Sequence, residues 1–260
     1  MEALIQADNL KFFKKLVDIF NALLNQMTLL CTESGFEIHA VDSANIAFLS
    51  VELSRDFFEE YWIREDEEII KMGISVPHLN LIATSIKRQM VIKMTSPVTL
   101  NFIEDMGDKS MKREMEMNLM QIEDENFVCT MPLHHYDYEV KMTASKFEEI
   151  CNCIIKCDDT MSITGYCDRV IFETVEKNIL SAKIEITFQE NKDLLSSQPI
   201  KLHFSCKYLK IISQLAQVTE TVVLCLSSHD PTIPLQLKYF SNKNSHFRVS
   251  YFLASKIEEC

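Results

Sequence analysis

Cysteine and histidine are the residue types in this chain whose spacing could support metal chemistry. The candidates are Cys151, Cys153, Cys157, Cys167 and the pair His134-His135. A structural zinc site usually contains a CxxC pair, and the sequence has none. Cys151 also falls on the apolar side of an expected helix, beside Ile150 and Ile154. We therefore expect buried free thiols here, and no metal ion or other cofactor.

Carboxylates gather in two runs, Glu65–Glu68 and Glu123–Glu125, which are typical of solvated loops rather than of an acid/base pair. The sequence lacks GxSxG and HExxH, so it offers no common nucleophile or metalloprotease motif. It also lacks GxGxxG and GxxxxGK[ST], the loops that cradle phosphates, and has only 4 glycines. The sequence therefore predicts a protein that is not an enzyme.

The composition is that of a globular protein, with 260 residues, 47% hydrophobic and 25% charged. No uncharged run approaches the roughly 20 apolar residues that a membrane span requires. The first residues lack the basic segment and apolar core of a signal peptide. Nine cysteines, an odd number, fit a reducing compartment. We expect a soluble intracellular protein with no membrane partner.

A helical pattern recurs four times along the chain. Apolar residues spaced by three and four predict helices over Asn9–Leu24, Val76–Arg88, Ala144–Lys156 and Cys206–Gln217. The equivalent anchors Phe13, Leu79, Phe147 and Leu209 are separated by 66, 68 and 62 residues. Alternating or β-branched segments follow the helices, at Met27–Leu30, Phe36–Ala40, Met90–Phe102, Thr160–Phe172, Lys183–Phe188 and Thr221–Phe240. Each half of the chain is thus predicted to hold two helix-plus-sheet units.

The segment Leu119–His135 divides the two similar halves. It is acidic, contains Pro132 and shows no sustained periodicity, as expected of a connector between domains. An ordinary surface loop is the alternative. The predicted domains are residues 1–118 and 136–260, joined by residues 119–135.

Basic charge is concentrated on the predicted helices. Windows 8–25, 75–89, 143–156 and 205–217 hold 9 basic and 4 acidic residues, a charge of +5 in a chain of −12. The remainder therefore carries −17. This asymmetry favours a surface that faces phosphates without reading bases. The alternative is that solvated helix faces are simply rich in lysine.

Several segments together resemble a known family. They are Leu10–Leu24, His39–Phe48, Val140–Met142, Phe147–Cys151, Pro234-Leu235 and Leu253–Glu259. In these segments the sequence resembles the eukaryotic-type DNA sliding clamps, the proliferating cell nuclear antigen family. The resemblance spans the whole length, and its most specific parts are the tail and the loop at Asp42-Ser43.

The resemblance implies an α+β clamp fold of two tandem similar domains, each with two helices packed on antiparallel sheets. It implies a homotrimeric ring that encircles double-stranded DNA and has no catalytic activity. Such a ring acts as a DNA polymerase processivity factor and docks replication and DNA repair proteins that bear a clamp-binding peptide motif. A clamp loader, and a location in the nucleus or a viral replication compartment, are implied as well.

The resemblance also assigns three sets of residues. The DNA-facing set is Lys11, Lys14, Lys15, Lys87, Arg88, Lys146, Lys207 and Lys210. The partner-peptide pocket is Val41, Ile46, Phe48, Met131, Pro132, Tyr136, Pro234, Leu235, Ala254, Ser255 and Ile257. The subunit interface is Met115, Met117, Leu180, Ala182 and Ile184, with the strand around Glu114–Leu119 pairing that around Ile179–Thr187.

Some positions depart from the family pattern. The third helix has Glu148, Glu149 and Asn152 where arginines are common, and Asn45 and Ser255 replace a usual His and Pro. Two alternatives therefore stand beside the homotrimer. One is a subunit of a heteromeric checkpoint-type clamp, and the other is a clamp-fold scaffold or transcription protein that does not encircle DNA.

Overall fold

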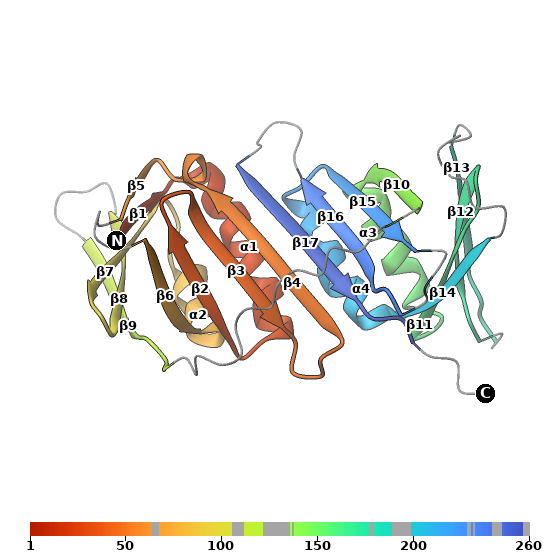
Figure 1. Cartoon of the computed structure of the whole chain (residues 1–260), viewed down its shortest axis with the longest axis horizontal. Helices are drawn as coiled ribbons and strands as arrows, with labels where there is room; N and C mark the ends of the chain where they lie inside the picture. The colour runs from red at the N-terminus through yellow and green to blue at the C-terminus, as the bar shows by residue number, and fades with distance from the viewer. Residues whose placement is uncertain are drawn as a thin grey trace. The chain divides into compact units, whose positions relative to one another are not determined.

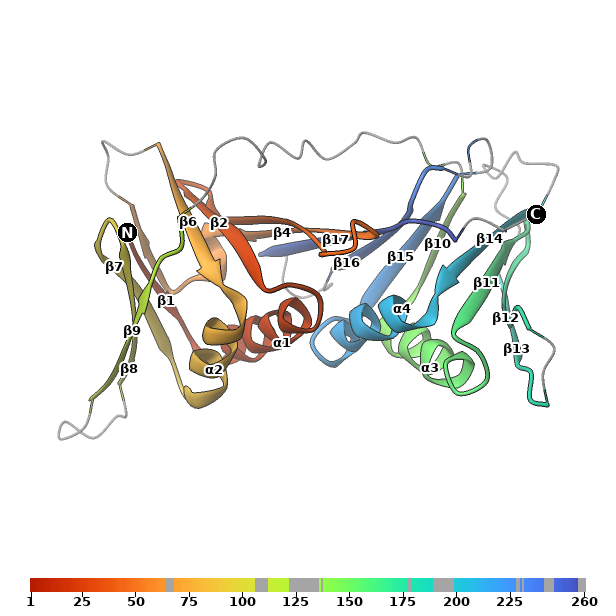
Figure 2. The same ribbon diagram turned by 90° about the horizontal axis from the view of Figure 1, so that it is seen from below.

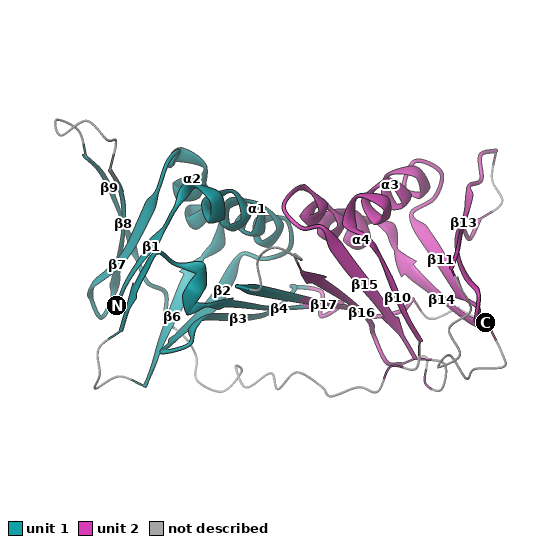
Figure 3. Cartoon of the chain, turned by 90° about the horizontal axis from the view of Figure 1, so that it is seen from above, with its two compact units in different colours: residues 1–43, 49–130, 244–249 teal, residues 44–48, 131–243, 250–260 magenta. Residues whose placement is uncertain are grey.

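The computed structural model describes residues 1–63, 68–105, 112–121, 136, 138–176, 179–188, 199–227, 230, 232–240 and 246–256. The chain forms two compact units (Figure 3). Unit 1 comprises residues 1–43, 49–130 and 244–249, and unit 2 comprises residues 44–48, 131–243 and 250–260. The predicted α+β class is confirmed, because each unit combines two α-helices with antiparallel strands (Figure 1).

Unit 1 contains two rows of strands and the helices α1 (Ala7–Leu23) and α2 (Val76–Ser85). The five-stranded sheet has the order β5-β1-β7-β8-β9. Its strands are Glu60–Trp62, Glu2–Ile5, Met90–Ser96, Thr99–Asp105 and Lys112–Asn118. The second row has the order β4-β3-β2-β6, with strands Ala47–Ser54, Gly35–Val41, Gln26–Thr32 and Ile69–Ser75. A short 3₁₀-helix, η1 (Arg55–Phe57), follows β4.

Unit 2 repeats this plan with α3 (Ala144–Ile154) and α4 (Cys206–Ser213), which continues into the 3₁₀-helix η3 (Gln214–Gln217). A four-stranded sheet has the order β13-β12-β11-β14. Its strands are Lys183–Thr187, Arg169–Thr174, Thr160–Gly165 and Ile200–Ser205. The other row has the order β10-β15-β16-β17, with strands Tyr138–Thr143, Thr221–Leu226, Leu235–Phe240 and Phe247–Leu253. The first residues of β17, 247–249, belong to unit 1.

The core of unit 1 forms where the helix pair meets the sheets (Figure 2). Phe13, Val17 and Phe20 of α1 and Leu79 of α2 face apolar side chains of β2, β3, β6, β7 and β8. These are residues of the apolar stripe that the sequence predicts. In addition, the ring of Phe12 stacks on that of Phe247, with centroids 3.9 Å apart. Helix α1 is therefore buried on a wider face than its 3-4 spacing indicates.

In unit 2 the same design buries one face of each helix. Phe147, Ile150 and Ile154 of α3 and Leu209 and Ile212 of α4 are all almost fully buried. The two helices pack against each other, as α1 and α2 do in unit 1. Each unit is thus held by the hydrophobic burial of a helix pair on antiparallel strands.

Two predicted helix ends were wrong, because α2 ends at Ser85 rather than Arg88 and α3 ends at Ile154 rather than Lys156. The fourth helical segment ends at Gln217 as predicted, but its last turn is the 3₁₀-helix η3. The end of α2 has a specific cause. The backbone N–H groups of Lys87 and Arg88 donate to the carboxylate of Glu104 instead of to helix carbonyls. Lys87 and Arg88 therefore lie in the turn between α2 and β7.

Candidate nucleic-acid interface and docking surfaces

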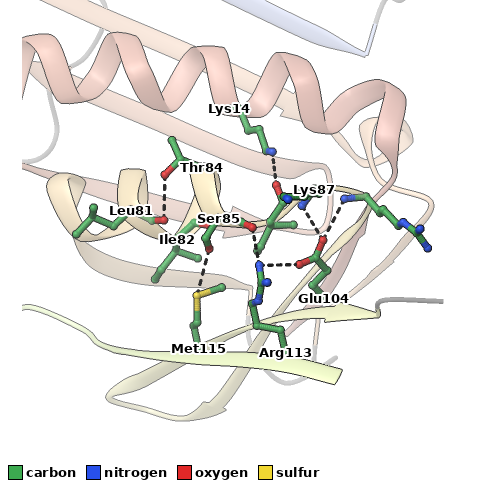
Figure 4. Close-up of polar contacts among 11 residues, drawn as sticks. Lys14, Leu81, Ile82, Thr84, Ser85, Lys87, Glu104, Arg113 and Met115 are labelled. Carbon is green, nitrogen blue, oxygen red and sulfur yellow. Dashed lines mark hydrogen bonds and ion pairs between the residues drawn. The ribbon is translucent and has the colours of Figure 1, made fainter. Parts of the chain in front are cut away.

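Five of the eight predicted DNA-facing cations belong to unit 1. Lys11 is exposed on α1, while Lys14 and Lys15 are half-buried. The ammonium group of Lys14 donates a hydrogen bond to the carbonyl of Ile86, just beyond α2. Lys87 and Arg88 are exposed in the turn that follows. Lys14 thus links α1 to the start of the turn that carries two of the other cations (Figure 4).

The other three predicted cations lie on the helices of unit 2. Lys146 is exposed on α3 and Lys207 is exposed on α4. Lys210 is half-buried and donates from its ammonium group to the side-chain oxygen of Asn152 on α3. Asn152, one of the departures from the family pattern, therefore ties α4 to α3.

The excess of basic charge is smaller on the helices than the sequence windows predict. Within their observed bounds, α1, α3 and α4 carry six lysines and four carboxylates, a charge of +2. Helix α2 has no Asp, Glu, Lys or Arg, and α3 has one lysine against two glutamates. The rest of the predicted +5 comes from Lys87, Arg88 and Lys156, which lie after the ends of α2 and α3.

Two strands that end their sheets carry the predicted subunit-interface residues. On β9, Met117 is buried and Met115 is half-buried, so both turn toward the helix side of the sheet. Ile184 on β13 is half-buried. Ala182 extends the pairing of this strand, because the N–H of Thr174 donates to its carbonyl (3.0 Å). Leu180 precedes this segment and is 58% exposed.

The opposite face of these two strands is exposed and charged. It carries Lys112, Glu114 and Glu116 on β9 and Lys183 and Glu185 on β13. Lys112 and Glu114 form an ion pair (3.6 Å), and Glu185 pairs with Arg169 (3.5 Å). The amide of Asn101 donates to Glu114 (2.8 Å). This hydrogen bond and the nearby Lys112 lower the pKa of Glu114, so its carboxylate stays charged at neutral pH.

The loop between β3 and β4 presents an apolar residue of the predicted peptide pocket. Asn45 has φ of +55°, a left-handed conformation that Asn tolerates well. The next residue, Ile46, is 38% exposed. The backbone N–H of Ala254 donates to the carbonyl of Ile46 (2.9 Å). The rings of Phe48 and Phe252 lie 5.6 Å apart. The loop and the segment after β17 are therefore held together within unit 2.

The remaining residues of the predicted peptide pocket differ in their exposure to solvent. The hydroxyl of Tyr136 donates to the carbonyl of Pro234 (3.0 Å). Leu235 is fully buried, so it can support a docking surface only from beneath. Val41 is 41% exposed at the end of β3, and Ser255 is half-buried. Met131, Pro132 and Ile257 lie outside the described residues.

Reactive chemistry is not apparent in the described part of the chain. There, no group of three or more His, Cys, Asp or Glu side chains could hold a metal ion. Cys151 is buried in α3, and burial raises the pKa of its thiol, which suppresses the reactive thiolate. No described helix is long and apolar enough to cross a membrane.

The sequence analysis missed the ion pair between the buried Glu104 and Arg113. It also missed the hydrogen bond between Lys210 and Asn152. A signal was available for the pair. On β8, Glu104 shares the inward phase of Leu100 and Phe102, and a carboxylate in that phase must be compensated. No sequence pattern marks Asn152, whose role depends on the distance between two helices.

Pairs of helices on antiparallel sheets, repeated in two tandem units with lysines on the helices, define the class of DNA clamps. The chain belongs to the proliferating cell nuclear antigen family. Its N-terminal domain model matches residues 1–126 and its C-terminal domain model matches residues 130–256. The family resemblance seen in the sequence is thereby confirmed. Members of this family act as sliding-clamp scaffolds rather than as enzymes.

Two relatives are similar to the chain over nearly its whole length. "Proliferating cell nuclear antigen 2" of Plasmodium falciparum is 22% identical over 259 residues, covering 95% of this chain and 96% of that protein. "Proliferating cell nuclear antigen" of Chaetomium thermophilum is 24% identical over 254 residues, covering 94% of each. At this identity the chain is a divergent member of its family.

Proposed function

We propose that three copies of this chain close into a ring around duplex DNA, and that the ring acts as a DNA polymerase processivity factor. The ring would also dock replication and repair proteins in the nucleus, and a clamp loader would place it on DNA. The observation that carries the proposal is the pair of terminal strands β9 and β13 with complementary faces. A strand at the end of one sheet can continue the sheet of a second copy.

The charges on the two strands favour one antiparallel register. In an antiparallel pair, directly opposite residues share a face, so the exposed charges of β9 oppose those of β13. Placing Lys112 opposite Glu185 also places Glu114 opposite Lys183. Shifting the register by two residues in one direction sets Lys112 against Lys183. Shifting it in the other direction sets Glu114 against Glu185 and leaves one attractive pair, Glu116 with Lys183, instead of two.

The same register also matches the inward faces. It sets Met115 opposite Ala182 and Met117 opposite Leu180, which are apolar pairs, and it sets Arg113, whose guanidinium is bound to Glu104, opposite Ile184. Leu180 is the most exposed of the four residues in the apolar pairs. Burying Leu180 against Met117 would supply hydrophobic stabilisation to the contact between copies. The two faces of the strands thus favour the same alignment.

The lysines on the helices support phosphate-directed binding without base readout. Lys11, Lys146 and Lys207 are exposed on three of the four helices, and Lys87 and Arg88 are exposed after α2. Because α2 itself has no charged residue, we expect weaker attraction to DNA than a strongly basic pore would give. A closed ring is retained by its topology, so modest affinity is compatible with the function.

The docking surface that we propose lies on unit 2. It would combine two groups of residues, Ile46 and Phe48 with Ala254, and Tyr136 with Pro234. Hydrogen bonds join Ile46 to Ala254 and Tyr136 to Pro234. A short peptide whose aliphatic and aromatic side chains project from one helical turn would bury them on such an apolar surface. This chemistry is that of the clamp-binding motif carried by polymerases and other partners.

Retention on circular DNA tests the ring directly. The protein is loaded onto a nicked circular duplex with a clamp loader, washed in high salt, and quantified before and after a single restriction cut. The proposal predicts that the protein stays on the circle and is released from the linear product, because it can slide off the ends. Equal retention on both forms would indicate ordinary binding, and loss from both would argue against encirclement.

A heteromeric clamp is the second candidate. The low charge of α2 and the two glutamates of α3 favour it, since unlike partners could supply the missing cations. In that case the chain alone would remain monomeric at micromolar concentration.

A further inference from the structure

Glu104 is a buried carboxylate in unit 1, with its side chain only 1% exposed. It lies on β8 directly opposite Arg113 of β9 in the strand register. Transfer of an ionised carboxylate out of water is costly unless hydrogen bonds and an opposite charge compensate it. The hydrogen-bond partners of Glu104 therefore indicate its structural role.

Both oxygens of Glu104 are engaged (Figure 4). One accepts from the backbone N–H groups of Lys87 (2.6 Å) and Arg88 (3.2 Å). The other accepts from the guanidinium of Arg113 (3.1 Å). Two of the three donors are thus the backbone of the turn after α2, at the residues that carry exposed cations.

Arg113 holds the same turn from its other side. The same guanidinium nitrogen donates to the carbonyl of Ser85 (2.6 Å), the last residue of α2. A helix leaves its final carbonyls without internal partners, and a cation near them is favourable. With Lys14 bound to the carbonyl of Ile86, polar groups of all four residues from Ser85 to Arg88 are held by charged side chains.

Part of the anchor of the turn comes from β9, the strand that ends the sheet. Arg113 and Met115 both project from β9 toward α2, and the hydroxyl of Ser85 contacts the sulfur of Met115 (3.4 Å). Arg113 and Met115 of β9 thus contact Ser85 at the start of the turn, while Glu104 of β8 holds the backbone of Lys87 and Arg88. The strand that would receive a second copy therefore shares in anchoring the turn.

We propose that Glu104 and Arg113 are positioning residues that hold the turn Ser85–Arg88, so that Lys87 and Arg88 present their charges to DNA phosphates. The presentation to DNA rests on the proposed function, whereas the holding of the turn does not. Neither residue contacts DNA in this scheme, because Glu104 is buried and the guanidinium of Arg113 is bound to Glu104. Their effect on binding is exerted through the backbone of the turn.

Amide hydrogen exchange of the intact protein tests the holding of the turn. In Arg113→Met we expect the amides of Lys87 and Arg88 to exchange about tenfold faster, because the turn loses its anchor on Ser85 and Glu104 loses its counter-ion. The control is Lys71→Met, which removes the same charge from an exposed position of β6 in the same unit and should change these rates less than about twofold. Arg113→Lys keeps the charge and should restore part of the protection.

A second variant protects the test against loss of folding. Leaving Glu104 buried without a counter-ion could unfold Arg113→Met, whereas Glu104→Gln combined with Arg113→Met removes both charges and should fold. Its Lys87 and Arg88 amides should still exchange faster than wild type, because the Ser85 anchor is absent. Wild-type protection of both amides in the folded variants would overturn the proposal.

Salt-dependent binding to a labelled duplex tests the consequence for DNA. Lys87→Ala with Arg88→Ala should make the plot of log affinity against log salt shallower by up to about 2, the value for two lost phosphate contacts. Arg113→Met should also lower the affinity for the duplex, and Lys71→Met should not. If the Lys87, Arg88 variant binds like wild type, the DNA-facing role of the turn fails and the proposal falls with it. If only the exchange result fails, the proposed ring function is unaffected.

Discussion

The lysines of the helices divide into two kinds at the scale of single residues. Lys14 and Lys210 hydrogen-bond to groups on neighbouring elements, the Ile86 carbonyl and the Asn152 side chain. Lys11 and Lys207 are exposed on α1 and α4. The sequence places all four on helices but does not distinguish these roles, because the partners are far away in the chain. A test of DNA contact should therefore change the exposed pair, since changing the other pair would also disturb packing.

Reversing the charge of the exposed lysines should weaken DNA binding without affecting stability. For Lys11→Glu with Lys207→Glu we expect a salt dependence shallower by about 2, from two lost phosphate contacts, and repulsion in addition. Binding of a labelled duplex measured over a salt series checks this. The control is the double variant Lys71→Glu with Lys93→Glu, at exposed positions of β6 and β7, which changes the net charge by the same amount. An equal loss in that control would assign the effect to net charge alone.

The exposed Ile46 is the residue on which peptide docking depends most directly. Ile46→Asp should weaken binding of a labelled peptide with one aliphatic and two aromatic anchors by at least about tenfold, because a charge would enter an apolar contact. Ile155→Asp is the control, since Ile155 also belongs to unit 2 and is 36% exposed, close to the 38% of Ile46. Fluorescence anisotropy of the peptide gives both affinities. Unchanged affinity in Ile46→Asp would place the docking surface elsewhere.

At the scale of elements, the strands that end the sheets carry the specificity of assembly. The alternation of Lys183, Ile184 and Glu185 is visible in the sequence and correctly predicts a strand with one exposed face. Its position at the end of a sheet is not visible there, because strand order depends on contacts between distant segments. The charge match between β9 and β13 follows only once both strands are known to be terminal.

A charge swap tests the proposed register. Lys183→Glu should weaken self-association, because it sets two glutamates against each other and costs roughly 1 kcal/mol at each contact between copies. Adding Glu114→Lys should restore the attraction with its sign reversed. Sedimentation velocity over a concentration series measures both variants. Failure of the second change to restore association would contradict this register while leaving other pairings of the two strands open to test.

Helix positions were predicted well and helix ends poorly, for a physical reason. The 3-4 spacing of apolar residues reports on burial of a face, and all four helices follow it. An end depends instead on where the next backbone groups find partners. After α2 those partners are Glu104 and Arg113, which lie on strands further along the chain. Helix periodicity alone could not locate this end.

At the scale of the whole molecule, the repeat is what the sequence reveals most clearly. Four helical patterns at intervals of 62 to 68 residues predicted two similar halves, and the structure has two helices in each of its two units. The family models match both halves. The candidate sites were less predictable, since the pocket residues include the fully buried Leu235, and the cations on the helices are fewer than the sequence windows indicated.

The central claim is that three copies of the chain close into a ring, and the mass of the protein in solution tests that claim most directly. Light scattering on a sizing column at micromolar concentration should give three times 30.1 kDa, about 90 kDa. That mass would mean that identical chains assemble without unlike partners. A species of 30.1 kDa that persists as concentration rises would contradict the homotrimer and favour a clamp built with unlike partners.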